Sequence, residues 1–210
     1  MTTQKYLNIV SHYESCLEKH GDTHLGVDWP NQADALTRYR VMLEVVRAQA
    51  PTRVSLLDFG CGASHLYDYI LENGIRDIDY SGLDISEKFV QLSRQKYPQT
   101  HYYCTDILKE SSGLPQFDYI VMNGVFTEKR ELSHDEMWEY FRQMILKTFE
   151  RTRAGLAFNV MSAHVDWERE DLFHLPIDKL TGFLVKEVSR DFVIRHDYKL
   201  YEYTTYVYRR

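Results

Sequence analysis

The chain has 210 residues, of which 44% are hydrophobic and 27% charged, and its formal net charge is −6. This size and composition predict one folded domain with an appendage. The acidic balance argues against a nucleic-acid partner, because phosphate binding requires an excess of Lys and Arg on one face. No apolar run approaches the ~20 residues that cross a bilayer and no secretory signal is present, so we expect a cytoplasmic protein without a membrane partner.

Residues 1–50 are predicted to be a helical extension that folds as a lid over residues 51–210, with the whole chain forming one domain. Apolar residues at helical spacing predict helices over Tyr6–Lys19 and Ala33–Ala50, the second ended by Pro51. The segment between them is rich in turn formers but also carries Trp29. A loop of this kind on a rigid scaffold is typical of a functional segment, so Trp29 is a candidate substrate contact.

From Val54 onward, short apolar strands alternate with helices, which is the pattern of βαβ units. Strands are predicted at Val54–Phe59, Tyr80–Asp84, His101–Cys104, Tyr119–Asn123, Leu156–Met161, Phe192–His196 and Glu202–Tyr208. Helices are predicted at Ser64–Asn73, Glu87–Tyr97 and His134–Arg151, the last beginning with a capping box. The final two strands are joined by a short turn and must be antiparallel. The sequence therefore predicts an α/β fold with a doubly wound, seven-stranded, mostly parallel sheet and an antiparallel last strand.

The first strand leads into a glycine-containing turn, Asp58–Gly62, where the backbone can approach a nucleotide-like ligand closely. A dinucleotide fingerprint would need Gly or Ala at position 65, and His65 weakens that alternative without excluding a nicotinamide-dependent oxidoreductase. Asp84 ends the second strand, where a carboxylate can accept hydrogen bonds from both ribose hydroxyls. Asp106 ends the third strand and could accept from an adenine amino group, with Ile107 covering the ring.

Four motifs resemble the successive motifs of class I S-adenosylmethionine-dependent methyltransferases: LLDFGCG (56–62), GLDIS (82–86), CTDIL (104–108) and FDYIVMNGVF (117–126). The resemblance implies a Rossmann-like methyltransferase fold and S-adenosyl-L-methionine as cofactor. Carried over to this sequence, it implies cofactor contacts from Asp58, Gly60, Gly62, Asp84, Ile85, Asp106, Ile107 and Asn123. The alternative is a catalytically silent protein that binds the same cofactor.

The acceptor is predicted from the ends of the fourth and fifth strands. His164 is the proposed base and Asp166 the second choice, although a His on a polar loop is often merely solvated. Further substrate contacts are expected from Phe126, Asn159 and Trp167. Asn123 is not followed by the two prolines of the amino-methylating nucleic-acid enzymes, which disfavours a DNA base as acceptor.

Three longer segments resemble small bacterial methyltransferases of sugar and natural-product biosynthesis: HGDTHLGVDWPN, FNVMSAHVDW and HDYKLYEYTTYVYR. This implies a small-molecule acceptor, such as a sugar or a secondary metabolite, methylated at an O or N atom. We expect no metal, because Asn123 offers only a neutral oxygen at the strand ends and the three cysteines are widely spaced without a CxxC pair. The sequence leaves a homodimer open.

Overall fold

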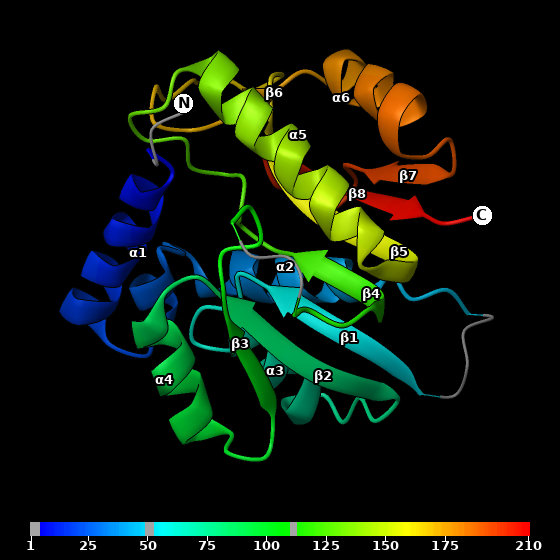
Figure 1. The fold of residues 1–210 in the computed structure, drawn as a ribbon. Helices are drawn as coiled ribbons and strands as arrows, with labels where there is room; N and C mark the ends of the chain where they lie inside the picture. Colours follow the sequence, from blue (N-terminus) through cyan, green and yellow to red (C-terminus); the bar gives the residue numbers. More distant parts are fainter. Residues whose placement is uncertain (1–4, 49–52, 110–112) are drawn as a thin grey trace.

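One mixed sheet forms the centre of the computed structural model, which describes residues 5–48, 53–109 and 113–210 (Figure 1). Its strands are β1 (Val54–Phe59), β2 (Ile78–Asp84), β3 (His101–Cys104), β4 (Phe117–Met122), β5 (Thr152–Ser162), β6 (His174–Leu175), β7 (Phe192–Arg195) and β8 (Glu202–Tyr208). They are arranged in the order β3-β2-β1-β4-β5-β8-β7, and β6 pairs with β5. All pairs are parallel except those that β8 makes with β5 and β7. The predicted fold class is confirmed, and the two-residue β6 adds an eighth strand.

Helices cover both faces of this sheet (Figure 1). They are α1 (Leu7–His20), η1 (His24–Val27), α2 (Gln32–Leu43), α3 (His65–Glu72), α4 (Glu87–Lys96), α5 (His134–Glu150), α6 (Ile177–Phe183) and the π-helix η2 (Leu184–Val188). One buried cluster packs Tyr39 of α2 and Ile70 of α3 against the sheet. The other packs Phe141 of α5 and Phe183 of α6 against its opposite face. The central strands are consequently covered on both sides, which explains why β1 is buried along nearly its whole length.

The strand order determines where a ligand can bind. From β1 the chain passes through α3 to β2 and through α4 to β3, moving toward one edge of the sheet. From β4 it passes through α5 to β5, moving toward the other edge. Right-handed crossovers in opposite directions place their helices on opposite faces and leave a crevice between β1 and β4, outside their carboxyl ends. In Figure 1 the arrowheads of β1 and β4 point toward the side on which α1 lies.

Several boundaries differ from the prediction. The helix predicted over Ala33–Ala50 ends at Leu43, because Val45 and Val46 form tighter turns with i→i−3 hydrogen bonds. Pro51 and the predicted boundary between residues 50 and 51 lie outside the described residues. The prediction also lacked η1, β6, α6 and η2, which are short elements between the longer ones.

The capping box of α5 is confirmed. The Ser133 hydroxyl accepts from the backbone amide of Glu136 at 3.2 Å, and the Glu136 carboxylate accepts from the backbone amide of Ser133 at 2.8 Å. Two otherwise unpaired amides of the first turn are thereby satisfied. Over the described residues, none of the helices is both long and apolar enough to cross a membrane.

Candidate active site

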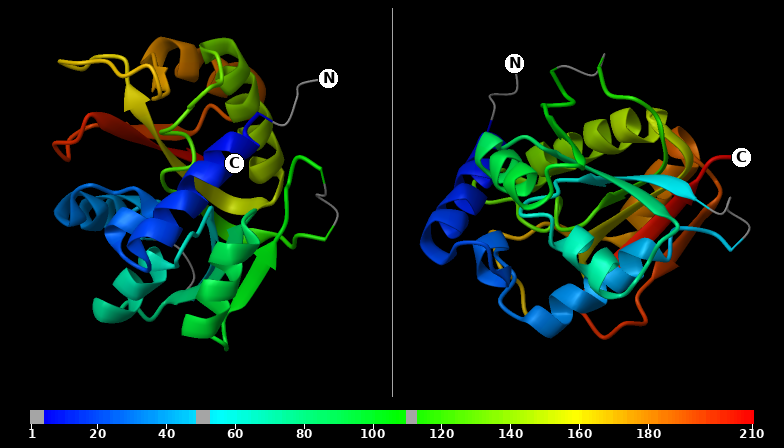
Figure 2. Two further views of the ribbon diagram at one scale, coloured as in Figure 1. Left: turned by 90° about the vertical axis from the view of Figure 1, so that its left-hand side faces the viewer. Right: turned by 90° about the horizontal axis from the view of Figure 1, so that it is seen from below.

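A cavity of about 1110 Å³, its open mouth included, lies at the carboxyl ends of β1, β2, β3 and β4. Side chains from the helices α1 to α5, from η1 and from Trp29 complete its lining, and both views in Figure 2 show α1 beside this end of the sheet. The lining includes every residue predicted to contact the cofactor, and also Trp29: Trp29, Asp58, Gly60, Gly62, Asp84, Ile85, Asp106, Ile107 and Asn123.

The turn after β1 brings backbone to the cavity surface. Gly60 and Gly62 have φ values of 75° and 50°, a region that residues with a Cβ adopt at a cost. A Cβ on Gly60 would lie 2.8 Å from Cγ2 of Val125, so this turn also packs closely against the segment after β4. The amides of Gly60 and Cys61 both donate to the carbonyl oxygen of Leu83, at 2.7 and 2.9 Å, which fixes the turn to β2.

Asp84 connects this turn to the start of α4. Its carboxylate accepts hydrogen bonds from the backbone amides of Gly62 and Ser86, each at 2.9 Å. The side chain is largely buried, and burial raises the pKa of the Asp84 carboxyl while the amides of Ser86, Gly62 and Ile85 oppose that rise. Asp84 therefore presents a positioned hydrogen-bond acceptor at the floor of the cavity.

Asp58 is a second buried acid beside Asp84. It is 3% exposed, and its Oδ2 accepts a hydrogen bond from the Tyr80 hydroxyl at 2.9 Å. Burial raises the pKa of the Asp58 carboxyl to about 7; the Tyr80 hydroxyl opposes this rise, and the negative charge of Asp84 adds to it. Two acids with raised pKa values favour a ligand that carries positive charge, because such a ligand stabilises their ionised forms.

Asp106 lies at the end of the cavity nearest the start of α1. Its Oδ2 accepts from the Tyr6 hydroxyl at 2.5 Å, and its Oδ1 accepts from the backbone amide of Leu108 at 3.0 Å. The Tyr6 ring stacks on Tyr140 of α5 with centroids 5.2 Å apart. The neighbouring Ile107 is buried. This end of the cavity therefore combines a carboxylate with apolar and aromatic surface, which suits a flat heteroaromatic ring with a polar edge.

Trp29 and Gly124 form one wall of the cavity, called here the Trp29–Gly124 wall. Gly124 has a φ of 79°, and a Cβ there would lie 2.7 Å from the Trp29 ring. Its amide donates to Asn159 Oδ1 at 2.8 Å, and Asn159 Nδ2 donates to Glu202 Oε1 at 3.0 Å. The Arg38 guanidinium donates to the same Glu202 oxygen at 2.8 Å and lies over the Trp29 ring at 4.2 Å. A buried polar network therefore holds both sides of this wall.

Asn123 also lines the cavity, and its Oδ1 is buried without a hydrogen-bond partner among the described residues. An acceptor of this kind is costly unless a ligand or water satisfies it. Asn123 Oδ1 is therefore an available contact for a ligand's donor group.

Two residues predicted as substrate contacts lie behind the cavity surface. Phe126 is fully buried and packs edge-on against Phe141 and Phe158, because the chain turns inward after β4 and directs this ring into the core. Asn159 is also fully buried, and it supports the cavity wall through its hydrogen bonds with Gly124 and Glu202.

The three predicted residues after β5 lie outside the described cavity lining. The backbone amide of His164 donates to Ser162 Oγ at 3.0 Å, and Asp166 accepts a hydrogen bond from the Tyr201 hydroxyl at 2.7 Å. Trp167 is 41% exposed and contacts the edge of Tyr201. These residues follow the carboxyl end of β5 at Ser162, but neither β5 nor the segment after it contributes to the described cavity lining.

Sequence reasoning missed the contribution of α1. Tyr6, Ile9, Val10 and Tyr13 line the cavity and follow the i, i+3, i+4, i+7 spacing of one helix face. The same spacing is typical of simple core packing, so the sequence offered no means of distinguishing a ligand-facing stripe from a buried one.

A family model described as a methyltransferase domain matches residues 57–146. Rv1506c of Mycobacterium tuberculosis, provisionally named a methyltransferase, is 25% identical over 170 residues, which are 79% of this chain and 98% of Rv1506c.

Solved structures share the fold. The magnesium protoporphyrin IX methyltransferase ChlM of Synechocystis PCC 6803 superposes with a TM-score of 0.67 at 14% identity, covering 98% of this chain and 97% of its own. The plantazolicin methyltransferase BpumL gives a TM-score of 0.60 at 14% identity, covering 100% and 92%. The matched domain, the relative and the shared strand order together support a class I S-adenosylmethionine-dependent methyltransferase.

Proposed function

We propose that this enzyme methylates an oxygen or nitrogen atom of a small molecule, a sugar or a secondary metabolite, by in-line displacement. The observation that carries the proposal is the single cavity to which four successive strand ends contribute, with the acids Asp58, Asp84 and Asp106 along it. The net charge of −6 supports a small molecule over a nucleic acid as acceptor. Solved relatives in fold are named for magnesium protoporphyrin IX and for plantazolicin, which also supports a small-molecule acceptor.

The residues present fit the cofactor. We assign Asp84 to the ribose hydroxyls, Asp106 and Ile107 to the adenine ring, and Asp58, Gly60 and Gly62 to the methionine part. The raised pKa values of Asp58 and Asp84 support this assignment, because the cofactor carries an ammonium and a sulfonium group. The unpartnered Asn123 oxygen supports a role in the wall that faces the transferred methyl.

The cofactor supplies an electrophilic methyl group on a sulfonium sulfur, so the protein is required mainly to position the acceptor in line. The carbon–sulfur bond breaks as the acceptor's bond to carbon forms, S-adenosylhomocysteine leaves, and the acceptor loses a proton. We propose that residues 1–50 act as a lid that excludes water during this step. The lid proposal is supported by Tyr13, Val27 and Trp29, which all line the cavity.

A base is required only if the acceptor is protonated at the attacking atom. His164, with Asp166 second, remains our proposal for that role, and it requires an acceptor long enough to extend from the cavity to the loop after β5. Substitution His164→Ala is then expected to slow turnover of such an acceptor while leaving S-adenosylhomocysteine affinity unchanged. Equal turnover would remove His164 from the mechanism.

Calorimetric titration with S-adenosylhomocysteine tests the cofactor assignment. Asp84→Asn is expected to weaken binding by about tenfold or more, since a charged hydrogen bond contributes about 1.5–3 kcal/mol. Asp79→Asn is the matched control, because Asp79 lies on the same strand, is 68% exposed and pairs only with Arg53 at the surface among the described ion pairs. Equal affinities for the wild type and Asp84→Asn would contradict the assignment, and tight NAD binding would favour an oxidoreductase.

Mass spectrometry of a metabolite pool incubated with the enzyme and S-adenosylmethionine tests the transfer itself. A product heavier by one methylene unit, absent when the cofactor is omitted, is the expected result. Binding of S-adenosylhomocysteine without any such product across sugar and secondary-metabolite pools would support the catalytically silent alternative.

A further inference from the structure

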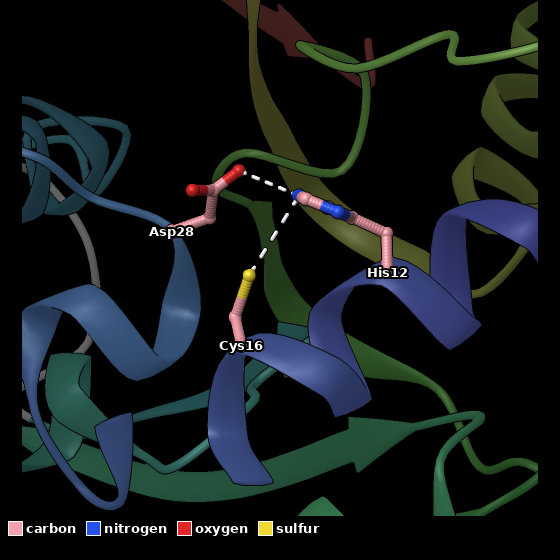
Figure 3. Close-up of side chains that lie close together, drawn as sticks. All are labelled: His12, Cys16 and Asp28. Atoms are coloured by element: carbon pink, nitrogen blue, oxygen red, sulfur yellow. Dashed lines mark hydrogen bonds and ion pairs between the residues drawn. The ribbon is translucent and has the colours of Figure 1, made fainter. Parts of the chain in front are cut away.

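Three side chains that are common metal ligands converge beside the cavity (Figure 3). His12 and Cys16 are one turn apart on α1, and Asp28 follows η1. His12 Nε2 lies 2.8 Å from Asp28 Oδ2 and 3.7 Å from Cys16 Sγ, and the three atoms lie within 4.8 Å of one another. All three residues are half-buried.

The contacts among these three side chains converge on a single ring nitrogen. A ring nitrogen of neutral His is either a donor or an acceptor, so Nε2 can donate to the Asp28 carboxylate or accept from the Cys16 thiol. Both contacts are directed to this one atom (Figure 3), so a protonated Nε2 donates chiefly to Asp28 and makes only a weak contact with Cys16 Sγ. Three lone pairs that meet in one place are, by contrast, what a bound cation requires.

We propose that His12, Cys16 and Asp28 bind a divalent transition-metal ion of the zinc class. Thiolate and imidazole ligands favour such an ion over Mg²⁺ or Ca²⁺, which take oxygen ligands. In a tetrahedral zinc site the N···S and N···O separations are about 3.5 and 3.3 Å. The observed N···S separation of 3.7 Å is already close to this value, and the observed N···O separation of 2.8 Å reaches it when the carboxylate moves outward by about half an ångström.

The charges of the three ligands fit the same ion. A thiolate and a carboxylate with a neutral imidazole balance a doubly charged cation, which matters in a half-buried site. Three protein ligands also leave a fourth position for water or another small ligand, as in catalytic rather than structural zinc sites.

The ion would join two separate parts of the cavity lining. His12 precedes Tyr13 of α1, and Asp28 lies between Val27 and Trp29; Tyr13, Val27 and Trp29 all line the cavity. Asp28 has a left-handed backbone with a φ of 58°, a conformation that Asp adopts more readily than most residues. The cysteine spacing predicted no zinc site, because only one of the three ligands is a cysteine and the other two are a histidine on the same helix and an aspartate after η1.

Metal binding is tested on the metal-free full-length chain by competition for Zn²⁺ with a chromogenic chelator. The wild type is expected to bind one Zn²⁺ per chain, and Cys16→Ser to bind it at least tenfold more weakly. Cys104→Ser is the matched control, since Cys104 is a free, exposed cysteine, and it should bind as the wild type does. Asp28→Asn is a second ligand variant that keeps a residue suited to the left-handed backbone.

Replacing Zn²⁺ by Co²⁺ adds a spectroscopic readout. The wild type and Cys104→Ser should show a thiolate-to-cobalt charge-transfer band, and Cys16→Ser should lack it. Melting curves without metal check that each variant is folded. The proposal is overturned if the wild type binds no stoichiometric Zn²⁺, if both ligand variants bind as tightly as the wild type, or if the charge-transfer band is absent from the wild type.

Discussion

Replacing Asp58 by asparagine should change how the stability of the cofactor-free protein depends on pH. Burial raises the pKa of Asp58 from its ordinary 3.8 to about 7, so the folded state holds this proton more tightly than the unfolded state does. The associated stability is fully present below about pH 4 and is lost as the pH rises through about 7. The amide side chain of the Asp58→Asn variant cannot ionise, and its oxygen can still accept the hydrogen bond from Tyr80.

The difference between the two pKa values corresponds to about 4 kcal/mol over the whole range. About 2–3 kcal/mol of this falls between pH 5 and pH 8, the range in which urea unfolding is easily measured. The free energy of unfolding of the wild type should therefore decrease with pH, relative to that of Asp58→Asn, by this amount. Parallel curves for the two proteins would refute the reasoning, because they would mean that Asp58 ionises in the folded protein as it does in the unfolded chain.

Three further changes test the packing around the site. Gly124→Ala should weaken S-adenosylhomocysteine binding at least tenfold by calorimetry, because its Cβ would meet the Trp29 ring at 2.7 Å; unchanged affinity would contradict this. Arg38→Met should cost about 3–5 kcal/mol in urea unfolding by leaving buried Glu202 unpaired, and a cost under 1 kcal/mol would argue against a charged pair. Ser133→Ala should cost about 1 kcal/mol by removing the cap of α5, and no loss would contradict the capping box.

The convergence of Asp58, Asp84 and Asp106 on one cavity could be predicted because each belongs to a local feature at or near a strand end. The strands β1, β2 and β3 are each followed closely by, or end in, a glycine or a carboxylate. Parallel strands bring these ends to one edge of the sheet, independently of the loop conformations. The correct order of strands was therefore sufficient to predict that Asp58, Asp84 and Asp106 lie near one another. The pattern from Val54 to Met161 supplied that order.

The positions of the predicted substrate contacts were harder to predict, because they depend on residues that are far away in the sequence. Phe126 and Asn159 were expected to touch substrate, but one fills the core and the other hydrogen-bonds to Gly124 and Glu202. Likewise His12 and Asp28 meet only because α1 folds back against the segment after η1. No spacing in the sequence encodes such contacts, since they depend on how separate elements pack.

The ion pair between Arg38 and Glu202 joins positions 164 residues apart, and this has a consequence for the order of events during synthesis. The ribosome completes α2 long before it makes β8. Arg38 and Asn159 can therefore form their hydrogen bonds with the Glu202 carboxylate only after β8 has been synthesised. That carboxylate reaches them when β8 inserts between β5 and β7, a pairing of high contact order. A growing chain can therefore form the end of the cavity that holds Asp84 and Asp106 early, while the Trp29–Gly124 wall is completed among the last parts of the molecule.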